Sequence, residues 1–284
     1  MQKTFSEIFE IQGIGLHSGL PSKMTFYPAD ANSGIVFVRA DLPNKPEFKA
    51  LYGQVVDTRN CTCLGNEKKE IVSTIEHIMA ALYVLGVDNA RIEVTNPETP
   101  IMDGSAKVFY DELKKVPLKE LSAKRKYLKV LQKVEFDDGK GAKVILEPSD
   151  KLHVHFMIDF PSKIVGHQEF DGDIEPSVFA VKIAPARTFC EKYQVDYLRS
   201  IGLIKGGSLE NAVVLDGEKI LNEGGFRVEN EAVNHKVLDC IGDMYTSGYR
   251  LLANITAEKS GHFHNNEVLK KLFADTHNYQ IIEE

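Results

Sequence analysis

Hydrophobic and polar residues alternate in two segments of the chain that resemble each other. The first runs from Lys23 as KMTFYPADANSGIVFVRA, and the second runs from Lys143 as KVILEPSDKLHVHFMIDF. Each contains an alternating stretch, a proline, an aspartate two residues later and a second alternating stretch. A period of two predicts β-strands. The pattern therefore predicts that one arrangement of strands occurs twice in the chain.

A helical period follows each pair of strands. Residues 73–85, STIEHIMAALYVL, have apolar side chains three and four positions apart, and residues 231–246 predict a second helix. We expect Ser73 or Thr74 to cap the first helix. A glycine is expected to end each of the two helices: Gly86 and Gly248.

The repeat continues with a strand, a loop containing glycine and a second helix. These elements are expected at residues 90–95 and 106–115 in the first copy, and at 250–256 and 266–275 in the second. The second copy is longer by about 40 residues, and part of the excess, about 187–215, has a strand, helix, strand pattern.

The fold class predicted from this repeat is α+β. Two similar domains, residues 1–120 and 127–284, are separated by a polar linker at 117–126. Each domain is expected to be a mostly antiparallel sheet covered by two helices, with a βαβ insert in the second. Burying the helices of both domains against each other gives a sheet-helix-helix-sheet sandwich.

Composition narrows the class of protein further. The 284 residues are 43% hydrophobic and 26% charged, and the net charge of −7 argues against nucleic-acid binding. No apolar run reaches the roughly 18–20 residues of a membrane span, and the N-terminus lacks the apolar core of a signal peptide. Four cysteines without framework spacing are typical of free thiols, so we expect a cytoplasmic protein.

The first helices of the two copies carry the candidate chemistry. The first contains Glu76 and His77, and the second carries His235, Asp239 and Asp243 within an arc of roughly 80°. Two histidines and one carboxylate with an open position form a catalytic zinc site, which would also accept iron. A neighbouring carboxylate that is not a ligand could serve as general base. The alternative is a capped helix start and a solvated face with an i,i+4 polar pair.

A further histidine follows the last strand of the second copy. His262 is expected in a loop after Gly261, where it could act as a general acid whose pKa Asp243 raises. The alternative is a loop histidine that caps the next helix, as His264 could do. His153 and His155 are expected on a solvated strand face rather than in a metal site.

Three other short segments leave their roles open. Cys61-Thr-Cys63 is too short for a structural zinc site and is expected to line a loop. His17 in GIGLHSG fits either a turn or a pocket. The segment from Lys205, KGGS, lacks the spacing of a phosphate loop, and its glycines could instead let a ligand or a chain pass close to the backbone.

These motifs together resemble those of the zinc-dependent UDP-3-O-acyl-N-acetylglucosamine deacetylases of lipid A biosynthesis. The resemblance covers both copies in order. The matching segments are GIGLHSG (13–19), CTCLGNE (61–67), STIEHIMAAL (73–82), PIMDGSA (100–106), ARTF (186–189), GLIKGGSLENAVVL (202–215), HKVLDCIGDMY (235–245) and KSGHFHN (259–265).

The resemblance implies a role for individual residues. His77, His235 and Asp239 would bind one zinc ion, Glu76 would be the general base, and His262 the general acid with Asp243 as its partner. Thr188 and Lys236 would hold the carbonyl oxygen as it gains negative charge. Substrate contacts are implied at Cys61 near the metal, at Phe160 near the nucleotide, and along an acyl passage in the insert at Phe189, Gly207 and Ser208.

The implied reaction is hydrolysis of the acetamide of a nucleotide sugar that carries one acyl chain, in a Gram-negative bacterium. We expect a monomer without a nucleic-acid partner. Two departures from the family leave the acyl-length preference open: the polar run Thr58-Arg59-Asn60, and Phe263-His264 after His262. A different amide hydrolase and a non-catalytic binding protein for nucleotide sugars or lipid precursors are the alternatives.

Overall fold

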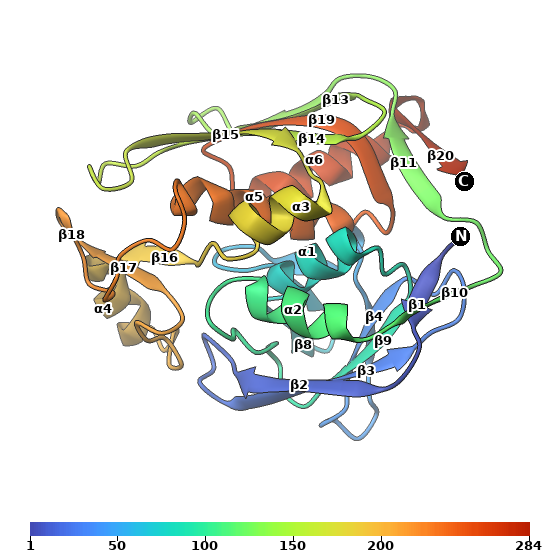
Figure 1. Cartoon of the computed structure of the whole chain (residues 1–284), viewed down its shortest axis with the longest axis horizontal. Helices are drawn as coiled ribbons and strands as arrows, with labels where there is room; N and C mark the ends of the chain where they lie inside the picture. The colour runs from blue at the N-terminus through green and yellow to red at the C-terminus, as the bar shows by residue number, and fades with distance from the viewer.

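The two largest sheets are built on the same plan (Figure 1). The computed structural model describes all of residues 1–284. The first sheet contains, in spatial order, β2 (Phe9–Ile14), β3 (Pro21–Pro28), β9 (Ala90–Val94), β4 (Ile35–Arg39) and β5 (Glu47–Lys49). The second contains, in the same order, β12 (Val134–Asp137), β13 (Lys143–Pro148), β19 (Arg250–Glu258), β14 (Leu152–Asp159) and β15 (His167–Asp173), and is extended by β11 (Lys126–Val130) and β20 (Tyr279–Glu283).

Strand register confirms the internal repeat. Pro28 pairs with Ala90 on the central strand of the first sheet, and Pro148 pairs with Ala253 on the central strand of the second. In both sheets the strand after the proline, β4 or β14, returns parallel to that central strand. The alternating side chains of β14 are buried at every second position, as a period of two requires.

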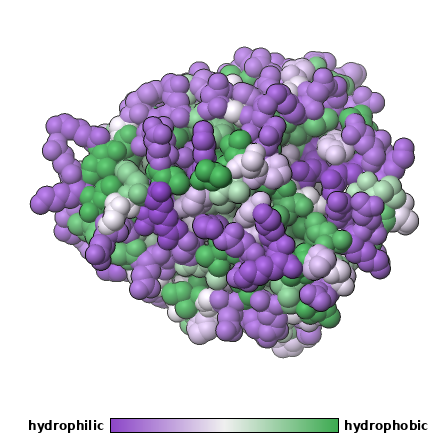
Figure 2. Space-filling view, in the orientation of Figure 1, coloured by the Kyte–Doolittle hydropathy of each residue, from purple (hydrophilic) through white to green (hydrophobic).

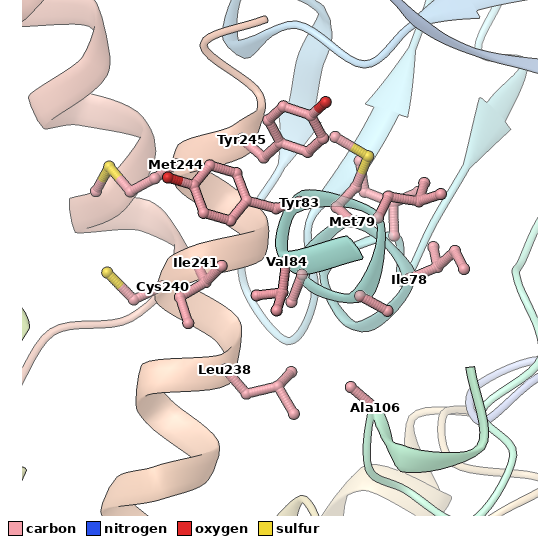
Figure 3. Close-up of a cluster of buried hydrophobic side chains, with 14 of the residues drawn as sticks. Ile78, Met79, Tyr83, Val84, Ala106, Leu238, Cys240, Ile241, Met244 and Tyr245 are labelled. Atoms are coloured by element: carbon pink, nitrogen blue, oxygen red, sulfur yellow. The ribbon is translucent and has the colours of Figure 1, made fainter. Parts of the chain in front are cut away.

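Four helices fill the space between the sheets, so the predicted α+β sandwich is confirmed (Figure 1). They are α1 (Glu76–Leu85), α2 (Lys107–Lys115), α5 (Glu231–Tyr245) and α6 (His262–Ala274). All of α1 except Leu85 and all of α5 except Lys236 is buried. Figure 3 shows the apolar side chains between these two helices, where the rings of Tyr83 and Tyr245 meet edge to face at 5.2 Å.

The insert has the predicted βαβ form. β16 (Phe189–Glu191) pairs in parallel with β17 (Val213–Asp216), and α4 (Lys192–Ser200) connects them. β18 (Lys219–Ile220) completes this sheet, and α3 (Pro176–Val178) with the π-helical turn η2 (Phe179–Ile183) precedes it. Figure 2 shows hydrophobic residues gathered at this end of the molecule.

The insert is attached to the first domain through backbone hydrogen bonds. The amides of Lys205 and Gly206 donate to the carbonyls of His17 and Leu16. A Cβ at Gly206 would lie 2.3 Å from the carbonyl oxygen of Gly15, so the glycine allows this close approach. The loop GIGLHSG therefore holds the insert in place.

Several predicted boundaries were wrong. α1 begins at Glu76, because Thr74 has φ of 61° and the hydroxyls of Ser73 and Thr74 bond to Pro97 and Glu98 instead of capping the helix. α6 begins at His262 rather than at 266, which places His262 on a helix and not in a loop.

The remaining elements are short. β10 (Leu118–Glu120) lies within the predicted linker and pairs with β1 (Lys3–Phe5). β6 (Val55–Asp57), β7 (Cys63–Gly65) and β8 (Ile71–Val72) form a small sheet, and η1 (Tyr52–Gln54) and η3 (Thr276–Asn278) are 3-10 turns. None of the helices has both the length and the apolar character that a membrane crossing requires. The boundary between residues 120 and 127 stays a prediction.

Candidate metal centre and active site

The contact between α1 and α5 brings together two histidines and a carboxylate. Oδ1 of Asp239 lies 3.6 Å from Nε2 of His77 and 3.5 Å from Nε2 of His235. All three residues are buried, and their candidate ligand atoms lie within 4.8 Å of one another. The sequence pattern alone left a solvated polar face as an alternative for α5, and burial excludes it.

The donor set fits a zinc ion. Donor atoms about 2.1 Å from a tetrahedral zinc ion lie about 3.4 Å apart, which is close to the two distances around Oδ1 of Asp239. That oxygen is buried and has no hydrogen-bond partner in the protein. A buried carboxylate oxygen without a partner is costly unless a cation neutralises it. His77, His235 and Asp239 could therefore hold the metal.

His235 is held in the tautomer that a metal ligand needs. Its Nδ1 donates a hydrogen bond of 3.1 Å to the carbonyl of Ala186, which leaves the lone pair of Nε2 facing Asp239. Burial lowers the pKa of His235 to about 3, so the imidazole is neutral. Burial acts to raise the pKa of Asp239, but the ammonium group of Lys236, which donates to its Oδ2 at 2.7 Å, holds it well below its usual value.

The segment that carries Ala186 is fixed by a buried ion pair. Nε of Arg187 donates to Oε1 of Glu231 at 2.8 Å, and the amide of Arg187 donates to the same oxygen at 2.9 Å. Glu231 is the first residue of α5 and is fully buried. The ion pair thus ties the carbonyl that orients His235 to the start of the helix that carries it.

A second group of polar side chains faces the metal cluster. Nδ1 of His262 lies 2.8 Å from Oδ2 of Asp243, and its Nε2 lies 4.0 Å from Oε1 of Glu76. Burial lowers the pKa of His262, but Asp243, Glu76 and Asp239 together outweigh burial and the result is a pKa of about 9. Burial raises the pKa of Glu76 above its usual value. A base and a proton donor can therefore face each other across a short gap.

Two residues of this group had no assigned role in the sequence prediction. The amide of Thr62 donates to Oε2 of Glu76 at 2.9 Å, and its hydroxyl donates to Oδ1 of Asp243 at 2.5 Å. Nδ2 of Asn265 donates to Oδ2 of Asp243 at 2.8 Å. Asn265 follows His262 by three residues on α6, and that helical spacing was its only sequence signal.

Lys236 lies beside the metal cluster. Its Nζ donates to Oδ2 of Asp239 at 2.7 Å, and the side chain is 22% exposed. Burial lowers the pKa of Lys236, but Asp239 outweighs this effect, so the pKa lies above its usual value. The ammonium group therefore stays charged beside the metal cluster.

A cavity of about 620 Å³ lies between the insert and the first domain. More than half of its lining is hydrophobic, and it includes Thr188, Phe189, Gly207 and Ser208. Of these, Phe189, Gly207 and Ser208 are the residues that the resemblance assigned to an acyl passage, and Thr188 is the residue assigned to the carbonyl oxygen. Thr188 follows Ala186 by two residues, so the cavity begins beside the segment that orients His235.

The other predicted residues lie around this cavity. The ring of Phe160 meets that of Phe189 at 5.2 Å. Cys61 and Cys63 line a second cavity of about 700 Å³, which shares His17 and Asn60 with the first. His17 is thus a cavity residue, and neither of its ring nitrogens has a partner in the protein. Burial raises the pKa of Cys61 well above its usual value, so its thiol stays protonated.

Two histidine predictions outside the site agree with the structure. His153 is on the outer face of β14 and pairs with Asp171 and Asp173 at 2.8 and 2.7 Å. Nδ1 of His264 accepts a hydrogen bond from the amide of Gly261 at the start of α6, which is a capping contact.

Comparison with known proteins agrees with this geometry. Residues 2–274 match the family described as UDP-3-O-acyl N-acetylglycosamine deacetylase. A UDP-3-O-acyl-N-acetylglucosamine deacetylase of Aliarcobacter butzleri (strain RM4018) is 41% identical over 286 residues, covering 99% of this chain and 93% of the relative. Proteins of the same name from Pasteurella multocida (strain Pm70) and Shewanella baltica (strain OS155 / ATCC BAA-1091) are 41% and 43% identical over 284 residues, covering 99% of this chain and 92% of each relative. The chain therefore belongs to the UDP-3-O-acyl-N-acetylglucosamine deacetylase family.

Proposed function

We propose that this protein hydrolyses the acetamide of UDP-3-O-acyl-N-acetylglucosamine and releases acetate and the free amine, a step of lipid A synthesis in a Gram-negative bacterium. One observation carries the proposal. A buried carboxylate and a buried imidazole, from Glu76 and His262, face each other at 4.0 Å beside a donor set that fits zinc. That arrangement places a general base, a general acid and a metal site close together.

Glu76 acts as the general base. It lies next to the ligand His77 on α1 but is not itself part of the donor set. Its raised pKa suits a group that takes a proton from the attacking water at neutral pH. The water oxygen then bonds to the acetamide carbon, and the proton remains on Glu76.

His262 acts as the general acid. Asp243 keeps the ring protonated and oriented through Nδ1, so the proton on Nε2 is directed toward Glu76 and the space between them. When the carbon–nitrogen bond breaks, the leaving nitrogen takes this proton. The products are the free amine and acetic acid, which ionises to acetate, and transfer of the proton from Glu76 to His262 restores both groups.

The carbonyl oxygen gains negative charge as water adds. Lys236 is charged and sits at the edge of the cluster, and the hydroxyl of Thr188 lines the adjoining cavity. Both would donate to this oxygen. A bound zinc ion, held by His77, His235 and Asp239, supplies a Lewis acid that polarises the carbonyl and lowers the pKa of water.

The acyl chain of the substrate occupies the cavity beside the insert. Support comes from its volume of about 620 Å³ and from a lining that is hydrophobic at Phe189, Leu198 and Val214 and also includes Gly207 and Ser208. Phe160 and Cys61 lie at the margins and contribute contacts to the nucleotide and near the metal. The nucleotide sugar is a small-molecule partner, and the net charge of −7 disfavours a nucleic-acid partner.

The enzyme works as a monomer in the cytoplasm. Every residue of the proposed site comes from one chain, so catalysis does not need a second subunit. All four cysteines are free thiols, as in proteins of reducing compartments. Light scattering of the purified protein measures the oligomeric state.

Acetate release tests the proposed function. The purified protein, loaded with about one zinc ion, is assayed on the acylated nucleotide sugar and on UDP-N-acetylglucosamine. We expect rapid release from the first and little from the second. Equal rates would contradict the role of the cavity, and release from an unrelated N-acyl compound alone would indicate a different amide hydrolase.

A further inference from the structure

We propose that Thr62 is a positioning residue that sets the distance between the general base and the general acid. The inference rests on the proposed function. Thr62 is 2% exposed and is flanked by the two cavity cysteines, Cys61 and Cys63. It touches both halves of the catalytic machinery, which arise from different domains of the repeat.

Three hydrogen bonds link the base to the acid, and a gap of 4.0 Å separates the two ends of this path. The amide of Thr62 holds Oε2 of Glu76, and its hydroxyl holds Oδ1 of Asp243. Oδ2 of Asp243 accepts from Nδ1 of His262, whose Nε2 returns to Oε1 of Glu76 at 4.0 Å. Each carboxylate therefore uses one oxygen for Thr62, and its other oxygen faces the ring of His262.

Thr62 is itself fixed by the backbone. Its carbonyl accepts from the amide of Ile75, the residue before α1. Its amide donates to the carboxylate of Glu76, so two backbone groups of Thr62 hold it against the start of that helix. Because the backbone at residue 62 is held in this way, the hydroxyl of Thr62 can hold Asp243 in one position.

Loss of the hydroxyl would leave a buried carboxylate oxygen of Asp243 without a partner. Asp243 would then be held only through Oδ2, by Asn265 and His262, so its carboxylate could turn about that oxygen and shift the ring of His262. A displacement of about 1 Å at a reacting group can reduce turnover about a hundredfold. Substrate binding would change little, because neither Thr62 nor Asp243 lines the cavity beside the insert.

The test compares Thr62→Val with Thr62→Ser and with a matched control. Thr25→Val removes the same kind of contact, a threonine hydroxyl on the carboxylate of Glu10, at β3 of the first sheet. For Thr62→Val we expect kcat on the acylated nucleotide sugar to fall about ten- to a hundredfold, with KM and zinc content unchanged. Thr62→Ser should restore most of the turnover, and Thr25→Val should keep all of it.

A double-mutant cycle with Asp243→Asn identifies the route of the effect. If Thr62 acts through Asp243, Thr62→Val should reduce kcat far less in the Asp243→Asn background than in wild type. Thr62→Ala serves the same comparison if the valine variant does not fold.

Three results would overturn the inference: wild-type kcat in Thr62→Val, a serine variant as impaired as the valine variant, or a loss of turnover explained by lost zinc. A wild-type protein that releases no acetate would instead contradict the proposed function.

Discussion

The Cα of Gly242 on α5 faces the backbone of Glu76 on α1 so closely that a Cβ there would lie 2.0 Å from the carbonyl oxygen of Glu76. The proposed base is therefore positioned by the point at which the two helices cross. The absence of a side chain at Gly242 lets the helices approach until His77, Asp239 and His235 meet.

Gly242→Ala tests this crossing. Glycine within a helix costs about 1 kcal/mol relative to alanine, so propensity alone favours the alanine variant. The close contact between the new Cβ and the carbonyl oxygen of Glu76 destabilises the alanine variant. This effect should exceed the gain in helix propensity, because the opposing atoms belong to a helix backbone. We expect a loss of about 1–3 kcal/mol in the free energy of unfolding and a lower kcat.

Urea unfolding and steady-state kinetics measure these effects. Gly53→Ala is the matched control, since a Cβ at Gly53 would meet nothing within 4 Å. An alanine variant at Gly242 that is more stable than wild type and fully active would show that the helices can separate without harm to the site.

Glu231→Gln tests the buried ion pair at the start of α5. Removing one charge of a buried pair leaves Arg187 uncompensated, which typically costs about 3–5 kcal/mol. Zinc affinity should fall as well, because the segment of Arg187 also carries the carbonyl that orients His235. Denaturant unfolding and competition with a zinc chelator report the two quantities separately.

The control for this variant is Glu218→Gln, whose partner Lys163 is on the surface. It should match wild type in both assays. Wild-type stability of Glu231→Gln would mean that neutral hydrogen bonds to Arg187 stabilise the fold as well as the ion pair does.

The pH dependence of turnover should report His262. A general acid must be protonated, and the pKa of about 9 keeps it so at neutral pH. The rate should therefore fall as pH rises through about 9. Asp243 faces the ring directly, and Glu76 and Asp239 lie nearby with the same sign of charge, so all three hold this pKa up.

Asp243→Asn should move the fall in rate to lower pH. Burial lowers the pKa of His262, and the variant lacks the charge of Asp243 that opposes this effect. Asp138→Asn is the control, since Asp138 faces the neighbouring His264 instead. An alkaline limb that stays in place in Asp243→Asn would assign that limb to another group.

The sequence predicted the repeat well because its signal is local. Alternation in β14 and the prolines Pro28 and Pro148 fixed equivalent strands without any knowledge of long-range contacts. The pairing of Glu76 and His77 with α5 then followed from the symmetry of two layers. The start of α6 was missed because Gly261 and His262 carry no cap signal of the usual kind.

Thr62 was beyond the reach of sequence patterns for a different reason. Its hydroxyl bonds to Asp243, 181 residues away, and its amide contact to Glu76 depends on a backbone direction that no spacing encodes. Similarly, Ser73 and Thr74 look like caps, but their hydroxyls are used by the loop at Pro97 and Glu98. At Thr62, Ser73 and Thr74, tertiary contacts determine the hydrogen bonds of the side chains, and local sequence preference does not.

Glu76 is proposed to be the base and not a metal ligand. Zinc content and acetate release of Glu76→Gln, measured on the same preparation, test this proposal most directly. The amide keeps the volume of the buried side chain and can still accept from Thr62. We expect about one bound zinc, as in wild type, with turnover reduced by orders of magnitude. A variant that loses its zinc, or one that keeps zinc and wild-type turnover, would contradict the proposal.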